Sequence, residues 1–97
     1  MLSGKQRRFL RALGNALDPI VQIGKAGVTE SVVFSLNEAL TARELVKARV
    51  LKNCFEEVKV VAQELTETTG SDLVQIVGRN IILYRPSEDK PLIELPK

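Results

Sequence analysis

The ten residues Val21–Glu30, VQIGKAGVTE, hold the end of a strand, a glycine-flanked turn and the start of a helix. Val21 and Ile23 lie on either side of a polar glutamine, an alternation typical of a strand. Gly24 and Gly27 bracket the turn, and Thr29 is a favourable residue at a helix N-terminus. The stretch therefore predicts a strand followed directly by a helix, which is the repeating unit of an α/β domain.

The residues before this unit predict an amphipathic helix with a basic outer face. Ser3 is a favourable N-cap for the segment GKQRRFLRALGNAL, and Asp18-Pro19 ends the helix because the residue before proline disfavours helical geometry. At 100° per residue the apolar side chains share one face, and the basic side chains lie outside it. The apolar stripe, which is expected to face the core, consists of Leu2, Phe9, Leu10, Leu13 and Leu17, and the outward basic residues are Lys5, Arg7, Arg8 and Arg11.

The residues after the unit predict a mixed sheet. Thr29 caps a second helix, on which Leu36 and Leu40 point inward and Phe34 points outward. The other expected elements are strands at Pro19–Ile23, Glu44–Lys52, Leu73–Val77 and Ile81–Tyr84, a third helix at Phe55–Thr69 ending at Gly70, and an irregular tail at residues 87–97. Residues 1–97 thus form one α/β domain of order α-β-α-β-α-β-β, with three helices and a four-stranded mixed sheet. The pattern leaves open whether the helices cover one face of the sheet or both.

The composition excludes several classes of function. The chain has no histidine and a single cysteine, Cys54, so it offers neither a zinc site nor a histidine-based acid–base centre. Cys54 and the pair Glu56-Glu57, at the expected start of the third helix, are interpreted as structural. No apolar run approaches the roughly 20 residues of a membrane helix, and no secretory signal is visible. We therefore expect a monomeric cytoplasmic protein that is not an enzyme and has no metal, cofactor, small-molecule substrate or membrane partner.

The loop Gly24-Lys25-Ala26-Gly27 matches two nucleotide-binding motifs only in part. A P-loop would need a glycine and a Ser or Thr where this chain has Pro19 and Ala26, and the further glycine of a dinucleotide fingerprint is missing. The remaining G-x-x-G pattern either only lets the chain turn or also holds a phosphate. The helix N-terminus, the two missing side chains and the mobile charge of Lys25 favour the phosphate.

The basic residues are concentrated at the start of the chain. Residues 1–27 hold five basic side chains and one acidic side chain, although the whole chain has a net charge of only +2. This asymmetry indicates a polyanionic partner, and a glycine loop beside a basic helix is a layout typical of nucleic-acid binding. The alternative is a protein-interaction module, in which the basic first helix contacts an acidic partner and Phe34 provides an anchor.

Two longer segments carry a family resemblance. Residues 3–32, SGKQRRFLRALGNALDPIVQIGKAGVTESV, and residues 74–86, VQIVGRNIILYRP, resemble the bacterial single-domain CRM family (chloroplast RNA splicing and ribosome maturation domain, YhbY type). The markers are the K-Q-R-x-x-L-R-x-L opening, the G-K-x-G-V-T loop and the closing G-R-x-x-x-L-Y-R-P. Together they are specific, and the similarity covers essentially the whole chain.

The resemblance implies a fold similar to the C-terminal domain of translation initiation factor three. It also implies binding to ribosomal RNA in precursors of the large ribosomal subunit, whose assembly the protein would assist. The G-x-x-G loop is likened to that of KH domains, which grip the backbone of about four nucleotides. By position, the implied RNA-binding residues are Gly24, Lys25, Ala26 and Gly27 in the loop, with Lys5, Arg7, Arg8, Arg11, Arg79 and Arg85. Because aromatic residues are few, we expect recognition of shape and backbone with modest sequence preference.

Overall fold

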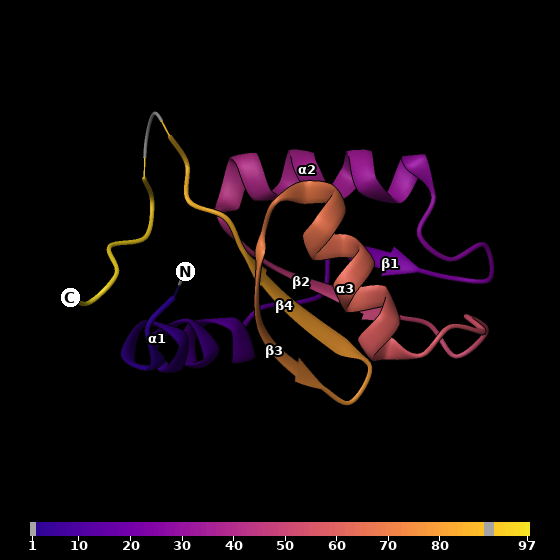
Figure 1. The fold of residues 1–97 in the computed structure, drawn as a ribbon, viewed down its shortest axis with the longest axis horizontal. Coiled ribbons are helices and arrows are strands. Elements are labelled where there is room, and N and C mark those ends of the chain that lie inside the picture. The colour runs from indigo at the N-terminus through magenta and orange to yellow at the C-terminus, as the bar shows by residue number, and fades with distance from the viewer. Residues whose placement is uncertain (1, 89–90) are drawn as a thin grey trace.

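The computed structural model describes residues 2–88 and 91–97, and the helices and strands within them follow the predicted order (Figure 1). The helices are α1 (Gly4–Asn15), α2 (Glu30–Arg43) and α3 (Val58–Thr69). The strands are β1 (Val21–Ile23), β2 (Leu45–Val50), β3 (Asp72–Val77) and β4 (Asn80–Tyr84). The predicted α-β-α-β-α-β-β order is therefore confirmed. Residues 89 and 90 of the predicted tail lie outside the described residues.

The four strands form one mixed sheet in the order β1-β2-β4-β3. Strand β1 pairs with β2 in parallel through the α2 crossover, and Val21 lies opposite Ala48. Strand β4 is antiparallel to both neighbours, and Gly78 and Arg79 form its turn with β3. The predicted combination of a parallel unit and an antiparallel hairpin is confirmed, and the hairpin strand β4 lies in the middle of the sheet.

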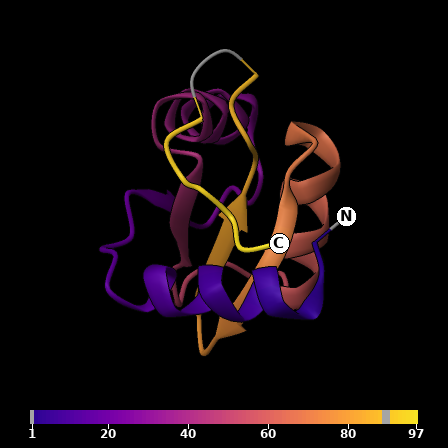
Figure 2. The ribbon, with the colours of Figure 1, turned by 90° about the vertical axis from the view of Figure 1, so that its left-hand side faces the viewer.

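The helices cover both faces of the sheet, which the sequence pattern left open. Helices α2 and α3 pack on one face, where alternate residues of β2 such as Val46, Ala48 and Val50 enter the larger core cluster. Helix α1 packs on the other face, where Leu10 contacts a smaller cluster that includes Ile82 and is completed by apolar residues of the C-terminal tail. In Figure 1 the sheet lies between α1 and α2, and in Figure 2 α1 runs across the front of the strands.

Helix α1 touches the sheet along a narrow line. Ser3 is its N-cap, as predicted, and forms a capping box, because its hydroxyl accepts from the Gln6 N–H at 3.1 Å while the Gln6 side chain accepts from the Ser3 N–H. A Cβ on Gly14 would lie 2.7 Å from Ile82 Cγ2, so the helix can approach this closely only because residue 14 is glycine. The prediction that Phe9 and Leu13 point into the core is wrong, because this narrow contact leaves them 38% and 40% exposed.

The third helix begins three residues later than the sequence predicted. Residues 51–57 form a loop, and Glu57 is the extended N-cap residue of α3, with φ −68° and ψ 147°. Glu56 and Glu57 therefore precede the helix, so the prediction that they occupy its first turn is wrong. Cys54 lies in this loop and is buried in the larger core cluster, and burial keeps its thiol away from solvent. Gly70 ends α3 in the left-handed conformation, with φ 66°, as predicted.

The C-terminal tail contains neither helix nor strand in residues 87, 88 and 91–97, yet Glu44 ties it to the domain. Glu44 follows α2 with a positive φ of 65° and is fully buried, so the predicted strand start at Glu44 is one residue early. Its carboxylate accepts from the backbone N–H groups of Ser87, of Leu92 at 2.6 Å and of Ile93 at 2.8 Å. Burial alone would raise the pKa of the Glu44 carboxyl, but these three donors hold it below its ordinary value of 4.5.

Replacing Glu44 by glutamine is expected to lower the free energy of unfolding by about 2 kcal/mol at neutral pH, because hydrogen bonds to a charged group are lost. A carboxyl with a lowered pKa stabilises the fold above its ordinary value and loses this contribution as pH falls through the folded-state pKa. The gap between the wild type and Glu44→Gln should therefore shrink below about pH 4.5. Urea unfolding at neutral pH and at about pH 3 measures the difference in unfolding free energy between the wild type and Glu44→Gln. A difference that is the same at both pH values would contradict a stabilising role of the ionised Glu44 carboxylate.

Candidate nucleic-acid interface

The glycine loop connects the end of β1 to the start of α2. The Gly27 N–H donates to the Gly24 carbonyl at 3.0 Å and closes the turn, with Lys25 and Ala26 exposed at its tip. Gly27 is buried and has a φ of 72°, yet a Cβ there would meet no atom within 4 Å, so there is room for a side chain. Two residues on, the Thr29 hydroxyl accepts from the Val32 N–H at 3.2 Å. The loop, exposed at its tip, thus leads into a capped helix N-terminus, whose N–H groups and dipole favour an anion.

A second loop, residues 51–57 between β2 and α3, lies directly beside the glycine loop. The Leu51 N–H donates to the Ile23 carbonyl at 2.8 Å, which joins the bases of the two loops. A Cβ on Gly24 would lie 3.6 Å from both Asn53 Oδ1 and Leu51 Cδ1. Figure 1 shows both loops at the same end of the molecule. Any ligand held by Gly24–Gly27 would therefore also approach the exposed residues of the second loop, beginning with Lys52.

Arg79, one of the predicted RNA contacts, holds the second loop in place. Its Nε donates to the Val50 carbonyl at 2.8 Å, and its Nη2 donates to the Leu51 carbonyl at 2.6 Å. The Val50 N–H in turn donates to the Arg79 carbonyl at 2.8 Å. The guanidinium therefore fixes the point where β2 becomes loop, and its contact with RNA stays a prediction.

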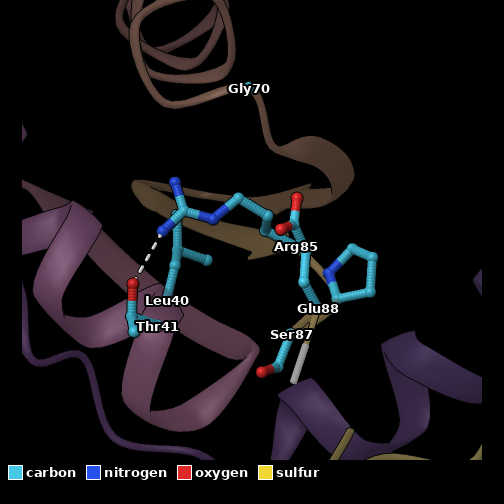
Figure 3. A pocket seen from close by; sticks show the side chains of 7 residues that line it. Leu40, Thr41, Gly70, Arg85, Ser87 and Glu88 are labelled. Atoms are coloured by element: carbon cyan, nitrogen blue, oxygen red, sulfur yellow. Dashed lines mark hydrogen bonds between the residues drawn. The ribbon is translucent and has the colours of Figure 1, made fainter. Parts of the chain in front are cut away.

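Arg85, the other predicted contact near the C-terminus, joins α2 to the end of α3. Its Nη1 donates to Asn37 Oδ1 and to the Thr69 carbonyl, both at 2.7 Å. Its Nη2 donates to the Asn37 carbonyl at 3.1 Å and to Thr41 Oγ1 at 3.0 Å. Arg85 also lines a pocket, where Figure 3 shows it reaching toward Thr41 with Glu88 nearby. This extended set of internal bonds gives Arg85 a role within the fold, and its contact with RNA also stays a prediction.

The four basic residues of α1 are not equivalent. Lys5 and Arg8 are exposed, whereas Arg7 and Arg11 are half-buried, and Arg7 Nη1 donates to the Leu73 carbonyl of β3. At 100° per residue, Arg7, Arg8 and Arg11 lie on the flank of α1 opposite the flank that meets the tail. The tail flank is marked by Gln6, whose Nε2 donates to the Pro96 carbonyl at 3.1 Å. The arginine flank therefore borders the part of the sheet that neither α1 nor the tail covers.

Two basic residues of β2, which the sequence analysis did not include in the site, lie on the same face of the sheet as α1. Lys47 is half-buried, and its Nζ donates to the Asn15 carbonyl at 3.4 Å. Arg49 is exposed and lies opposite Gln22 of β1 and Asn80 of β4. The alternation of Lys47 and Arg49 with buried residues was visible in the sequence. Their place in the site was not, because it depends on which face of the sheet α1 leaves open.

The glycine loop and α1 are not neighbours. Figure 1 shows them at opposite ends of the molecule, and the longest dimension of the molecule is 39 Å. The sequence-based expectation of a loop adjacent to the basic helix is therefore wrong, because α1 crosses the sheet near the opposite ends of the strands. The strip of sheet between them carries Lys47 and Arg49. We call the surface formed by the glycine loop, this strip and the arginine flank of α1 the basic surface.

Residues 2–88 and 91–97 contain neither a membrane-spanning helix nor a cluster of metal-ligating side chains. No helix there has both the length and the hydrophobicity that crossing a bilayer requires. The same residues contain no group of three or more cysteine, aspartate and glutamate side chains that could hold a metal ion.

Comparisons with known proteins identify the family. Residues 2–85 match the model of the CRS1 / YhbY (CRM) domain. The chain is 48% identical to "Probable RNA-binding protein YqeI" of Bacillus subtilis (strain 168), over 99% of this chain and all of that protein. It is 36% identical to an "RNA-binding protein" of Haemophilus influenzae, over 99% of this chain and 96% of that protein.

A solved structure shares the fold. The solution structure of protein SAV1595 from Staphylococcus aureus superposes with a TM-score of 0.84 at 47% identity, covering 99% of this chain and all of that one. Because the match covers almost the whole chain, the three helices and the four-stranded sheet share the fold of that structure. The chain belongs to the CRS1 / YhbY (CRM) domain family.

Proposed function

We propose that this protein binds RNA through the basic surface and takes no part in catalysis. The observation that carries the proposal is the Gly24–Gly27 loop, which presents an exposed Lys25 at the N-terminus of α2 in a chain of the CRM family. The names of the relatives in Bacillus subtilis and Haemophilus influenzae, which describe RNA-binding proteins, support it. The anionic backbone of RNA supplies the phosphate for which the loop is suited.

Binding would begin with the sugar-phosphate backbone at the glycine loop. The absence of side chains at Gly24 and Gly27 lets the backbone approach closely, and Lys25 adds a mobile positive charge. From there the RNA backbone would follow the strip past Arg49 toward the arginine flank of α1, because positively charged side chains line that route. Contacts to phosphate position a nucleic acid without reading its sequence. Arg79 and Arg85 would act through the fold, by fixing the second loop and by joining α2 to α3.

We further propose that the RNA is ribosomal, in precursors of the large ribosomal subunit, and that the protein assists assembly as a cytoplasmic monomer. The family resemblance of the opening, loop and closing motifs supports this assignment. Crosslinking the protein to RNA in cells and sequencing the attached fragments tests it. The expected result is enrichment of large-subunit ribosomal RNA, including unprocessed ends. Enrichment of messenger or transfer RNA instead would contradict the assignment.

Recovery of the protein from cell extract with and without ribonuclease separates RNA binding from protein binding. Ribosomal partners should be lost after ribonuclease treatment if RNA holds them. Partners that survive the treatment would favour the alternative, an interaction module in which the basic first helix contacts an acidic protein.

A further inference from the structure

Phe55 is exposed without a role in either core cluster. Its side chain is 80% exposed, and no other large apolar side chain among residues 2–88 and 91–97 is as exposed. The neighbouring Cys54 is only 7% exposed, and its N–H donates to the Leu51 carbonyl at 3.0 Å. The loop is therefore anchored by Cys54, and Phe55 projects into solvent from a fixed backbone. A large exposed aromatic ring in a fixed position suits a ligand better than it suits solvent.

The surroundings of Phe55 are those of the phosphate loop. Asn53, two residues before it, lies against Gly24, and Lys52 is exposed in the same loop. The Arg79 guanidinium fixes the carbonyls of Val50 and Leu51, so the loop that carries Phe55 is held before any ligand arrives. A preorganised ring loses less conformational freedom when a partner packs on it.

On the basis of the proposed function, we propose that Phe55 is a stacking platform for an unpaired base of the RNA whose backbone lies at Gly24–Gly27. Aromatic rings in single-strand-binding proteins stack on bases of any sequence, because every base has a π-face. Glu56 and Glu57 follow Phe55 toward α3 and repel phosphates. The backbone therefore runs on the side of Lys25 and Lys52, and its base turns toward the ring. RNA recognition then includes one base contact in addition to the backbone contacts expected from the sequence.

Phe34 offers a matched comparison, because it is also an exposed phenylalanine. Its side chain is 66% exposed on the outer side of α2, in a groove that Glu30 and Glu64 also line. These two carboxylates disfavour an approaching phosphate backbone. Both rings are well exposed, so a difference in RNA affinity or in quenching between variants at the two positions would report where the RNA binds.

Tryptophan variants test the proposal directly, because the chain contains no tryptophan. The variants Phe55→Trp and Phe34→Trp each carry a single tryptophan, which is excited selectively over Tyr84, and are titrated with an oligouridine of about eight nucleotides, a length within the usual site size of such proteins. We expect quenching of the emission from position 55 and unchanged emission from position 34. An abasic oligonucleotide of equal length should bind through its phosphates but quench position 55 much less.

Affinities complete the test. Phe55→Ala and Phe55→Leu should weaken binding of the oligouridine about tenfold or more, since a stacked base contributes on that scale, while Phe55→Trp keeps the affinity. Phe34→Ala should bind as the wild type does. Equal affinities for the wild type and Phe55→Ala, with unquenched emission at position 55, would overturn the platform and leave the RNA-binding proposal standing. Failure of the wild type to bind any RNA would overturn both.

Discussion

Replacing Gly27 by aspartate is expected to weaken RNA binding by at least tenfold while leaving the protein folded. The new carboxylate would enter the open space beside Gly27, close to the start of α2. There it is favourable to the helix dipole but occupies the place of a phosphate and repels others. A tenfold loss corresponds to about 1.4 kcal/mol of binding free energy. Fluorescence anisotropy of a labelled single-stranded RNA measures the affinity.

The matched control for this change is Gly70→Asp. Gly70 also has a positive φ, 66°, and a Cβ there would also meet no atom within 4 Å. Both variants thus carry the same backbone strain, of about 1 to 2 kcal/mol, and the same added charge. Gly70 lies at the C-terminal end of α3, outside the basic surface, so Gly70→Asp should bind RNA as the wild type does. Equal affinities of the two variants would remove the glycine loop from the binding site, and Lys25→Ala should then also have no effect.

Replacing Arg49 by glutamate is expected to weaken RNA binding about tenfold at low salt, with the difference shrinking as salt rises. Arg49 is an exposed strand residue opposite Gln22 and Asn80, so glutamate can be accommodated without burying a charge. The change removes one phosphate contact and adds a repulsive charge in the middle of the strip. The slope of log affinity against log salt should become shallower by about 0.7 or more, the value for one phosphate on a single strand.

Arg43→Glu is the control for this prediction. Arg43 is exposed at the last turn of α2, where it lines one groove with tail residues and a second groove with Lys47, and Arg49 lines neither of them. Arg43→Glu and Arg49→Glu change the net charge by the same amount, so any general effect of net charge on RNA affinity appears in both variants. Equal losses in Arg49→Glu and Arg43→Glu would mean that only net charge matters and that the strip has no special role.

The order of helices and strands could be predicted from the sequence because each depends on local signals. Ser3 and Thr29 cap their helices, and Gly70 ends the third one, as these residue types do in general. The sequence predicts too early a start for the third helix, because the residues from Phe55 to Glu57 have no local feature that excludes a helix. Tertiary contacts keep this segment in a loop instead, through the burial of Cys54 and the hydrogen bonds from Arg79.

The candidate site could be predicted only in part, for a related reason. The glycine loop was found because two glycines before a capped helix are a local signal. Arg79 and Arg85 could not be told from exposed arginines, since their hydrogen-bond acceptors come from residues at least 16 positions away. Arg49 and Phe55 were missed because their exposure depends on where α1 and the two loops lie. The sequence pattern predicts a strand residue at Glu44, but the role of its side chain depends on three N–H groups more than 40 positions away.

The most direct test of the proposed RNA-binding surface is an NMR titration of the backbone amides with a single-stranded RNA. The largest shift changes are expected at Gly24–Gly27, in the loop at residues 51–57, at Arg49 and along the arginine flank of α1. Amides on the outer face of α2, around Phe34, and in the tail should change little. Changes concentrated on the outer face of α2 and α3, with the glycine loop unaffected, would contradict the assignment of the basic surface.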